Sequence, residues 1–125
     1  MKTEFLAKAR ENLAVAELSY ENNHYNASAN RAYYAAFQAA IAALANASII
    51  TVHRISHGAV QSLFATELTR RRKIYPSSLK SYLPDLQRVR DDADYELKSV
   101  SKKEALKQLK KAKDFVETIA KEIEK

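Results

Sequence analysis

The most apolar and alanine-rich stretch of the sequence is Ser28-Ala29-Asn30-Arg31-Ala32-Tyr33-Tyr34-Ala35-Ala36-Phe37-Gln38-Ala39-Ala40-Ile41-Ala42-Ala43-Leu44. Alanine is the best intrinsic helix former, so this stretch is expected to be helical. Its large apolar side chains recur at positions 33, 37, 40/41 and 44, which is the spacing of one buried helix face. Because alanines fill most of the remaining face, neighbouring helices can approach on more than one side. The stretch therefore predicts a helix at the centre of a bundle.

The composition favours an all-α protein. The chain has 125 residues, with one glycine, two prolines and no cysteine. So few turn residues favour long helices joined by short loops over hairpins and sandwiches. The absence of cysteine excludes disulfides and thiolate metal sites. We expect residues 1–125 to form a single domain, an antiparallel up-and-down helical bundle of about five helices.

Localisation and charge restrict the classes of partner. The N-terminal residues 1–4 lack the apolar run of a signal peptide, and no stretch approaches the roughly 18 apolar residues of a membrane span. A cytoplasmic protein without membrane contact is therefore expected. The net charge of +6 suits an acidic partner such as nucleic acid, although values of about 2–8 are also ordinary for small soluble domains.

Apolar periodicity places the five helices at about residues 3–21, 26 or 27–47, 57–71, 77 or 78–97, and from 101 through 123. Thr3 and Ser56 are expected to cap the first and third helices, and Ser101 with Glu104 forms a capping box for the last. Pro84 predicts a kink near residue 80 or 81, because proline disturbs the preceding turn of a helix. Residues 48–56 are expected to form an irregular connection.

Arg90 and Asp94 lie four residues apart on the fourth expected helix, so their side chains can meet. Arg90 adjoins the apolar stripe, where a charge is costly unless it is paired. One interpretation is an internal ion pair that fixes the register of this helix. The other is that Arg90 faces a cleft, is oriented by Asp94 and grips a phosphate through its planar fork of donors.

His53 and His57 are four residues apart, with Arg54 between them. No histidine or acidic cluster nearby would complete a metal site, so no metal is expected. A histidine close to arginines suits general acid–base catalysis of RNA cleavage, since imidazole exchanges its proton near neutral pH. His57 and Arg54 are therefore candidate catalytic residues. The alternative is that the histidine caps or packs at a helix start.

Arg31 stands immediately before Tyr33 and Tyr34 in the central helix. It can snorkel outward while the tyrosines serve as core residues, or it can join Arg90 in a basic pocket between the second and fourth helices. A second positive run, Arg70-Arg71-Arg72-Lys73, suits either phosphate contacts or a solvated helix end. The sequence contains no glycine-rich phosphate loop and no serine-hydrolase or zinc-protease motif.

Four segments in order, spanning about residues 6–123, resemble the HEPN domain family, whose small helical domains often accompany nucleotidyltransferases. The segments are Ser28–Phe37; His57-Gly58-Ala59-Val60 followed by Leu63-Phe64; Arg90-x-x-Ala93-Asp94-Tyr95; and Ser101-x-x-Glu104-Ala105 with Ala112-x-x-Phe115-Val116. The third segment matches the Arg-x-x-Ala-Asp-Tyr pattern of the small stand-alone HEPN subfamily.

The resemblance implies an antiparallel helical bundle, frequently a homodimer, and a minimal nucleotidyltransferase partner in a toxin–antitoxin pair. Many active members are metal-independent ribonucleases with an arginine followed four to six residues later by histidine, and this sequence has no such pair. The leading hypothesis is therefore a protein that binds nucleotide or RNA phosphate. Its ligand-binding residues would be Arg31, Arg90, Asp94 and Tyr95, with Asp94 orienting Arg90 and Tyr95 supplying a hydroxyl or stacking on a base, assisted by Arg54 and His57.

Two alternatives remain open. The first is a ribonuclease toxin with a rearranged site, in which His57 is the base and Arg54 or Arg90 clamps the phosphate. The second is a purely structural dimerisation module, in which the polar residues only specify packing. None of the three hypotheses requires a cofactor.

Overall fold

The computed structural model describes residues 1–125 apart from the side chain of Arg54. Its α-helices are α1 (Lys2–Glu21), α2 (Tyr25–Asn46), α3 (His57–Leu63), α4 (Tyr82–Tyr95) and α5 (Lys102–Ile123). Three shorter helical segments are the 3-10 turns η1 (Val52–Arg54) and η3 (Ser77–Ser81) and the π-helix η2 (Phe64–Arg71). The described residues contain no strand, and none of their helices is both long and apolar enough to cross a membrane. The all-α bundle is confirmed.

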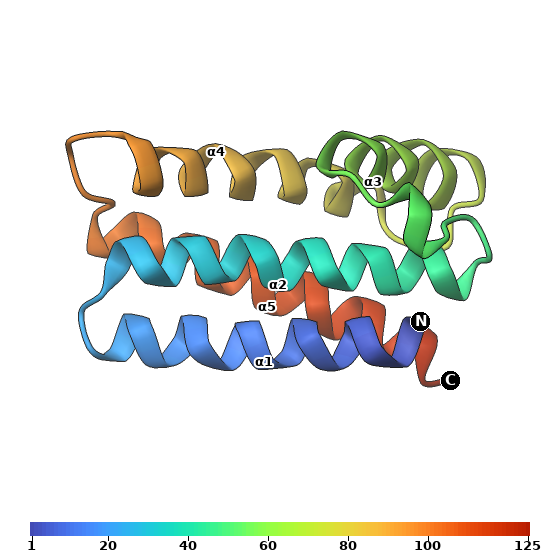
Figure 1. The fold of residues 1–125 in the computed structure, drawn as a ribbon, viewed down its shortest axis with the longest axis horizontal. Helices are drawn as coiled ribbons and strands as arrows, with labels where there is room; N and C mark the ends of the chain where they lie inside the picture. The colour runs from blue at the N-terminus through green and yellow to red at the C-terminus, as the bar shows by residue number, and fades with distance from the viewer.

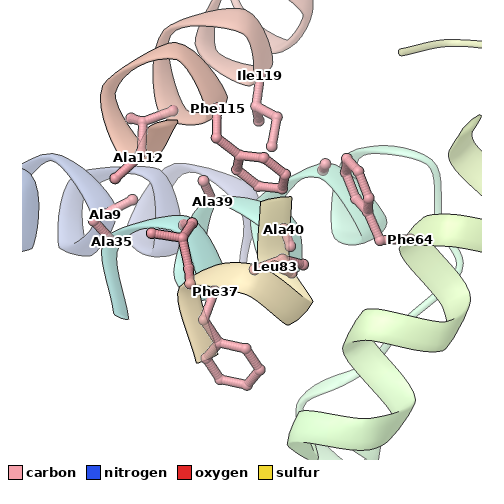
Figure 2. Packing of buried hydrophobic residues seen from close by; sticks show 14 of the residues in the cluster. Ala9, Ala35, Phe37, Ala39, Ala40, Phe64, Leu83, Ala112, Phe115 and Ile119 are labelled. Atoms are coloured by element: carbon pink, nitrogen blue, oxygen red, sulfur yellow. The ribbon is translucent and has the colours of Figure 1, made fainter. Parts of the chain in front are cut away.

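Helix α2 lies at the centre of the bundle. It runs beside α1, with α4 on its opposite side and α5 crossing it (Figure 1). Most of its alanines are completely buried, and their small side chains let three helices pack against one. Figure 2 shows Ala9 of α1 and Ala112 of α5 close to Ala35 of α2, in the same core cluster. The prediction of a central alanine-rich helix is therefore confirmed.

Two of the three capping predictions are confirmed. Ser56 Oγ accepts a hydrogen bond from the Ala59 amide at 3.2 Å, and Ser101 Oγ accepts one from the Glu104 amide at 3.1 Å. Thr3 as an N-cap is wrong. The Phe5 amide donates to the Met1 carbonyl at 3.1 Å, so α1 already begins at Lys2 and Thr3 lies inside its first turn.

The third and fourth helices differ from expectation in their internal form. The third continues as far as predicted, but from residue 64 onward it is a π-helix. The fourth begins as a 3-10 turn and becomes α-helical at Tyr82. This change falls beside the kink predicted from Pro84, which cannot donate to the carbonyl of residue 80. Helix α4 ends at Tyr95, two residues early, because Glu96 adopts an extended conformation (ψ 151°).

Asp85 ties α4 to α5. Its carboxylate accepts hydrogen bonds from Lys111, from Arg88 Nη2 at 2.8 Å and from Gln108 Nε2 at 3.2 Å. Burial by itself raises the pKa of Asp85, but the bonds from Lys111, Arg88 and Gln108 outweigh it and hold the pKa well below its ordinary value of 3.8. This network fixes the position of α4, the helix that carries Arg90 and Asp94.

We expect Asp85→Asn to lower the free energy of unfolding near neutral pH by about 1.5–3 kcal/mol, because it weakens three charge-assisted hydrogen bonds. The pKa of Asp85 is depressed in the folded protein, so its stabilisation is fully present above 3.8 and is lost as the pH falls towards the folded value. The difference in the free energy of unfolding between the wild-type protein and Asp85→Asn should therefore become smaller as the pH falls below 3.8. Urea unfolding followed by circular dichroism at several pH values measures it.

Asp92→Asn on the same helix is the control, since Asp92 is about half exposed and its nearest cation is Arg88 at 3.7 Å. We expect it to cost at most about 1 kcal/mol. Equal losses in the two variants, or a gap that does not change with pH, would contradict the role given to Asp85.

Candidate functional site

Two arginines from different helices meet at the ring of Tyr34 on α2. The Cζ of Arg31 lies 5.1 Å from the ring centroid, and the Cζ of Arg90 on α4 lies 5.5 Å from the same centroid. Arg90 is also 5.7 Å from the ring of Tyr33. Cations within about 6 Å of a ring centroid are attracted to its electron-rich face. The structure thus brings together Arg31 and Arg90, which are 59 positions apart in sequence.

Amide side chains hold the guanidinium of Arg31. Its Nε and Nη2 donate to Asn30 Oδ1 at 2.9 and 2.5 Å, and its Nη1 donates to Asn12 Oδ1 of α1 at 3.2 Å. Asn12 is fixed in turn by donating to Gln38 at 2.7 Å. Within the described residues the hydrogen bonds of Arg31 go only to amide oxygens. Its positive charge is therefore oriented without being neutralised by a carboxylate.

Arg90 is held by carboxylates instead. Its Nε lies 3.2 Å from Asp94 Oδ2 and its Nη1 lies 3.3 Å from Asp91 Oδ1. Burial tends to lower the pKa of Arg90, but Tyr34, Asp94 and Asp91 raise it overall. The predicted Arg90–Asp94 contact is present, and much of the charge of Arg90 is offset locally.

Asn30 bonds both to Arg31 and to Asp94, the carboxylate that holds Arg90. Its Oδ1 accepts from Arg31, and its Nδ2 donates to both carboxylate oxygens of Asp94 at 3.1 and 3.0 Å. This role was not predicted from the sequence, although Asn30 lies next to Arg31 in the alanine-rich stretch. The role of Asn12 was not predicted either, because the pattern of the first helix carries no signal for it.

His57 is oriented by the aromatic face of α2. Tyr33 Oη lies 2.6 Å from His57 Nδ1, and the imidazole stacks on Phe37 at 4.4 Å between ring centroids. Burial raises the pKa of Tyr33, so its hydroxyl keeps its proton at neutral pH. It donates to Nδ1 in one tautomer of the imidazole and accepts from Nδ1–H in the other. His57 as a residue is exposed, and among the described residues Nε2 has no hydrogen-bond partner. Nε2 is therefore the atom that His57 presents to a ligand.

Two glutamines connect this histidine to α4. Gln61 Nε2 donates to Tyr33 Oη at 3.4 Å and also to Gln87 Oε1. Both glutamines line a shallow hollow of about 380 Å³ between α3 and α4, which Asp91 also borders. The hydroxyl of Tyr33 thus belongs to a polar chain that links α2, α3 and α4.

Two of the other positions singled out from the sequence, Tyr95 and His53, are exposed. Tyr95 is the last residue of α4 and is 74% exposed, so it lies at the helix end without support from the core. The side chain of Arg54 lies outside the described residues, and its predicted role is not tested. His53 is exposed on η1. In the described part of the chain, no group of three histidine, cysteine, aspartate or glutamate side chains is placed to hold a metal.

The arrangement combines an uncompensated cation, a second cation on the same aromatic ring, and an oriented imidazole with one free nitrogen. Among known protein families, the chain matches the family model described as the HEPN domain, over residues 3–123. No curated protein matches the chain significantly. The family match covers all four segments from which the resemblance was drawn.

We expect Tyr33→Phe to release the imidazole of His57 while leaving the bundle folded. The substitution removes only the hydroxyl, so the free energy of unfolding should fall by about 0.5–1.5 kcal/mol. Ring ¹⁵N chemical shifts of His57 should then approach those of a freely exchanging imidazole. In the control Tyr25→Phe, which removes a hydroxyl bonded to Asn23 at 3.0 Å, the His57 signals should not change. Unaltered His57 shifts in Tyr33→Phe would show that the 2.6 Å contact does not fix the ring.

Proposed function

The chain belongs to the HEPN domain family, which is linked to RNA binding and to nuclease or toxin roles, and from this premise we propose that it binds RNA phosphate at the Tyr34 cluster. This cluster consists of Arg31, Tyr34, Arg90 and His57. The observation that carries the proposal is the cradle of Arg31, whose charge is fixed by amides and left available for an anion.

The roles of the two arginines follow from their partners. Asp94 and Asp91 offset the charge of Arg90, so the surplus positive charge lies at Arg31. A phosphate would therefore contact Arg31 first, while Arg90, held by Asp94, supports the ring of Tyr34. Arginine suits phosphate because its planar donors match two phosphate oxygens at once.

Family membership supports the proposal that the chain acts as a homodimer with a nucleotidyltransferase partner, as half of a toxin–antitoxin pair. The Tyr34 cluster lies on the outside of α2 between α1, α3 and α4, where a second protein can cover it. Co-purification of the chain with the product of an adjacent nucleotidyltransferase gene tests the partnership. If the chain and the nucleotidyltransferase do not co-purify, the proposed partnership is wrong, while RNA binding is decided by its own affinity measurement.

A second candidate function is metal-independent ribonuclease activity. It is favoured by the 2.6 Å contact that orients His57 while Nε2 stays free. In such a reaction His57 is in the tautomer whose Nδ1–H donates to Tyr33 Oη, so Nε2 carries the lone pair. Nε2 then accepts the proton of a ribose 2′-hydroxyl, whose oxygen attacks the adjacent phosphorus. The 2′-oxygen–phosphorus bond forms as the bond to the 5′-oxygen breaks. Water gives a proton to the leaving 5′-oxygen, and the resulting hydroxide takes the proton held at Nε2. Arg31 and Arg90 would stabilise the charge that builds up on the phosphate.

We expect Arg31→Gln to weaken binding of a short single-stranded RNA about tenfold or more, because the leading partner of the phosphate is removed. The salt dependence of log K should also become shallower, by about 0.7 for each phosphate that the variant no longer neutralises. Arg90→Gln should weaken binding less, and both variants should unfold cooperatively. Fluorescence anisotropy over a range of salt concentrations measures the binding.

Arg10→Gln is the matched control, because Arg10 is exposed and pairs with Glu124, which follows the C-terminal end of α5. If Arg31→Gln and Arg10→Gln lose equal affinity, the Tyr34 cluster is not the binding site. If the wild-type protein binds no RNA even at low salt, the structural dimerisation module is favoured. If Arg90→Gln fails to fold, its pairing with Asp94 is structural.

For the ribonuclease candidate, we expect the pure protein to cleave RNA in EDTA and to leave 2′,3′-cyclic phosphate ends. His57→Ala should then reduce the rate about 10²–10⁴-fold, the usual contribution of a positioned acid or base. His53→Ala is the control and should cleave at the wild-type rate. Absence of cleavage at any protein concentration would eliminate this candidate without affecting RNA binding.

A further inference from the structure

A second cleft lies at the connection between η2 and η3, away from the Tyr34 cluster. It encloses about 640 Å³. The chain here turns from the end of the α3–η2 helix back towards α4, at the yellow-green end of the bundle (Figure 1). The residues that line it are Thr69, Arg70, Lys73, Ile74, Tyr75, Pro76, Ser77 and Lys80. None of them belongs to the Tyr34 cluster.

The lining of this cleft is strongly positive. Arg70, Lys73 and Lys80 border it, and no carboxylate is among its lining residues. The structure divides the basic run 70–73 into two pairs. Arg71 bonds to Glu67 at 3.2 Å and Arg72 donates to the Ala47 carbonyl at 3.4 Å, so these two are engaged elsewhere.

The remaining basic residues at the cleft have no such partners. As far as the described residues show, Arg70, Lys73 and Lys80 take part in no ion pair with this chain. Three uncompensated cations around one hollow create a local positive potential that attracts an anion. Arg70, Lys73 and Lys80 are all exposed, so a ligand can reach them.

The wall of the cleft is rigid. The Leu68 carbonyl accepts two backbone hydrogen bonds, from the Ile74 amide at 2.9 Å and from the Tyr75 amide at 3.3 Å. Tyr75 is buried and its ring lies 5.5 Å from that of Phe64. Lys73 adopts a left-handed conformation with φ 54°, which reverses the chain between the two walls. The cations are thus presented by a backbone that is already ordered.

The lining of the cleft combines cations with apolar side chains. Along the chain, the cations Arg70 and Lys73 are followed by the apolar side chains of Ile74, which is 38% exposed, and Pro76, and then by the cation Lys80. A strand of RNA has the same alternation, with phosphates separated by a sugar and base. We propose that this cleft binds the phosphodiester backbone of single-stranded RNA, with phosphates at Arg70, Lys73 and Lys80 and a sugar or base against Ile74 and Pro76. The inference deepens the proposed function, because it rests on RNA being the ligand of this chain.

The test removes the three charges together in Arg70→Gln/Lys73→Asn/Lys80→Gln. Asparagine is chosen at position 73 because it tolerates positive φ. The control, Lys103→Gln/Lys107→Gln/Lys110→Gln, removes three exposed lysines from α5 and changes the net charge equally. We expect the cleft variant to bind a short oligouridine about tenfold more weakly, with a salt slope shallower by about 2 because three phosphates are no longer neutralised. The control should weaken binding less than about twofold. Equal effects in the two variants would overturn the proposal.

Amide chemical shifts of the wild-type protein provide a second readout that needs no variant at the cleft. Oligouridine should shift the amides of residues 69–80, and should do so in the Arg31→Gln background as well. A failure of RNA binding at the Tyr34 cluster is thereby distinguished from a failure at the cleft. Unshifted amides at residues 69–80 would overturn the proposal.

Competing anions identify the source of the phosphate. Inorganic phosphate and uridine monophosphate should shift the same amides only at much higher concentration than oligouridine. Equal affinity for free phosphate would show a simple anion site, and equal affinity for polyglutamate would show a site for acidic peptides. Either of these results would overturn the assignment to RNA.

Discussion

The close approach of helices across the alanines of α2 is the constraint on which the structure depends. Alanine buries a methyl group and loses no side-chain entropy in a helix, so α2 can be covered by α1, α4 and α5 without leaving gaps. Larger side chains from the partners, such as Phe115 of α5 and Leu83 of α4, then fill the space beyond these alanines (Figure 2). Because cores are packed as densely as crystals, this one surface constrains where each of the outer helices can lie.

The Tyr34 cluster is a consequence of the same packing. On the partly exposed face of α2, Asn30, Arg31 and Tyr34 stand in place of alanines, and the surrounding helices supply partners for them. Asn12 comes from α1 and Arg90 from α4. A charge beside a core is tolerated only when it is bonded or stacked, and each arginine meets that requirement differently. Arg90 is paired with carboxylates, whereas Arg31 is held by amides and keeps its charge. Arg90 is therefore a structural arginine, whereas Arg31 is available to an anion.

Predictions from the sequence are confirmed where the determining forces are local. The caps at Ser56 and Ser101 and the contact between Arg90 and Asp94 depend on spacings of three or four residues within one helix, and the structure contains them. Thr3 does not cap α1, since several backbone positions compete to start a helix. The π-helical form of residues 64–71 has no sign in the sequence, because the same apolar spacing fits both helix types. Tyr95 was expected to contact a ligand; it is the last residue of α4 and lies largely in solvent, and its ligand contact stays a prediction.

By itself the sequence determined an all-α bundle with a central alanine-rich helix, membership of a recognisable family, and three segments rich in polar side chains. These depend on composition and on periods of three to four residues, which a single chain displays directly. Only the tertiary structure decided which polar residues meet. It placed Arg31 and Arg90 on one ring, linked Tyr33 to His57, and divided the basic run 70–73 between paired residues and an open cleft. Such contacts join positions tens of residues apart, and they follow from how whole helices pack rather than from any local pattern.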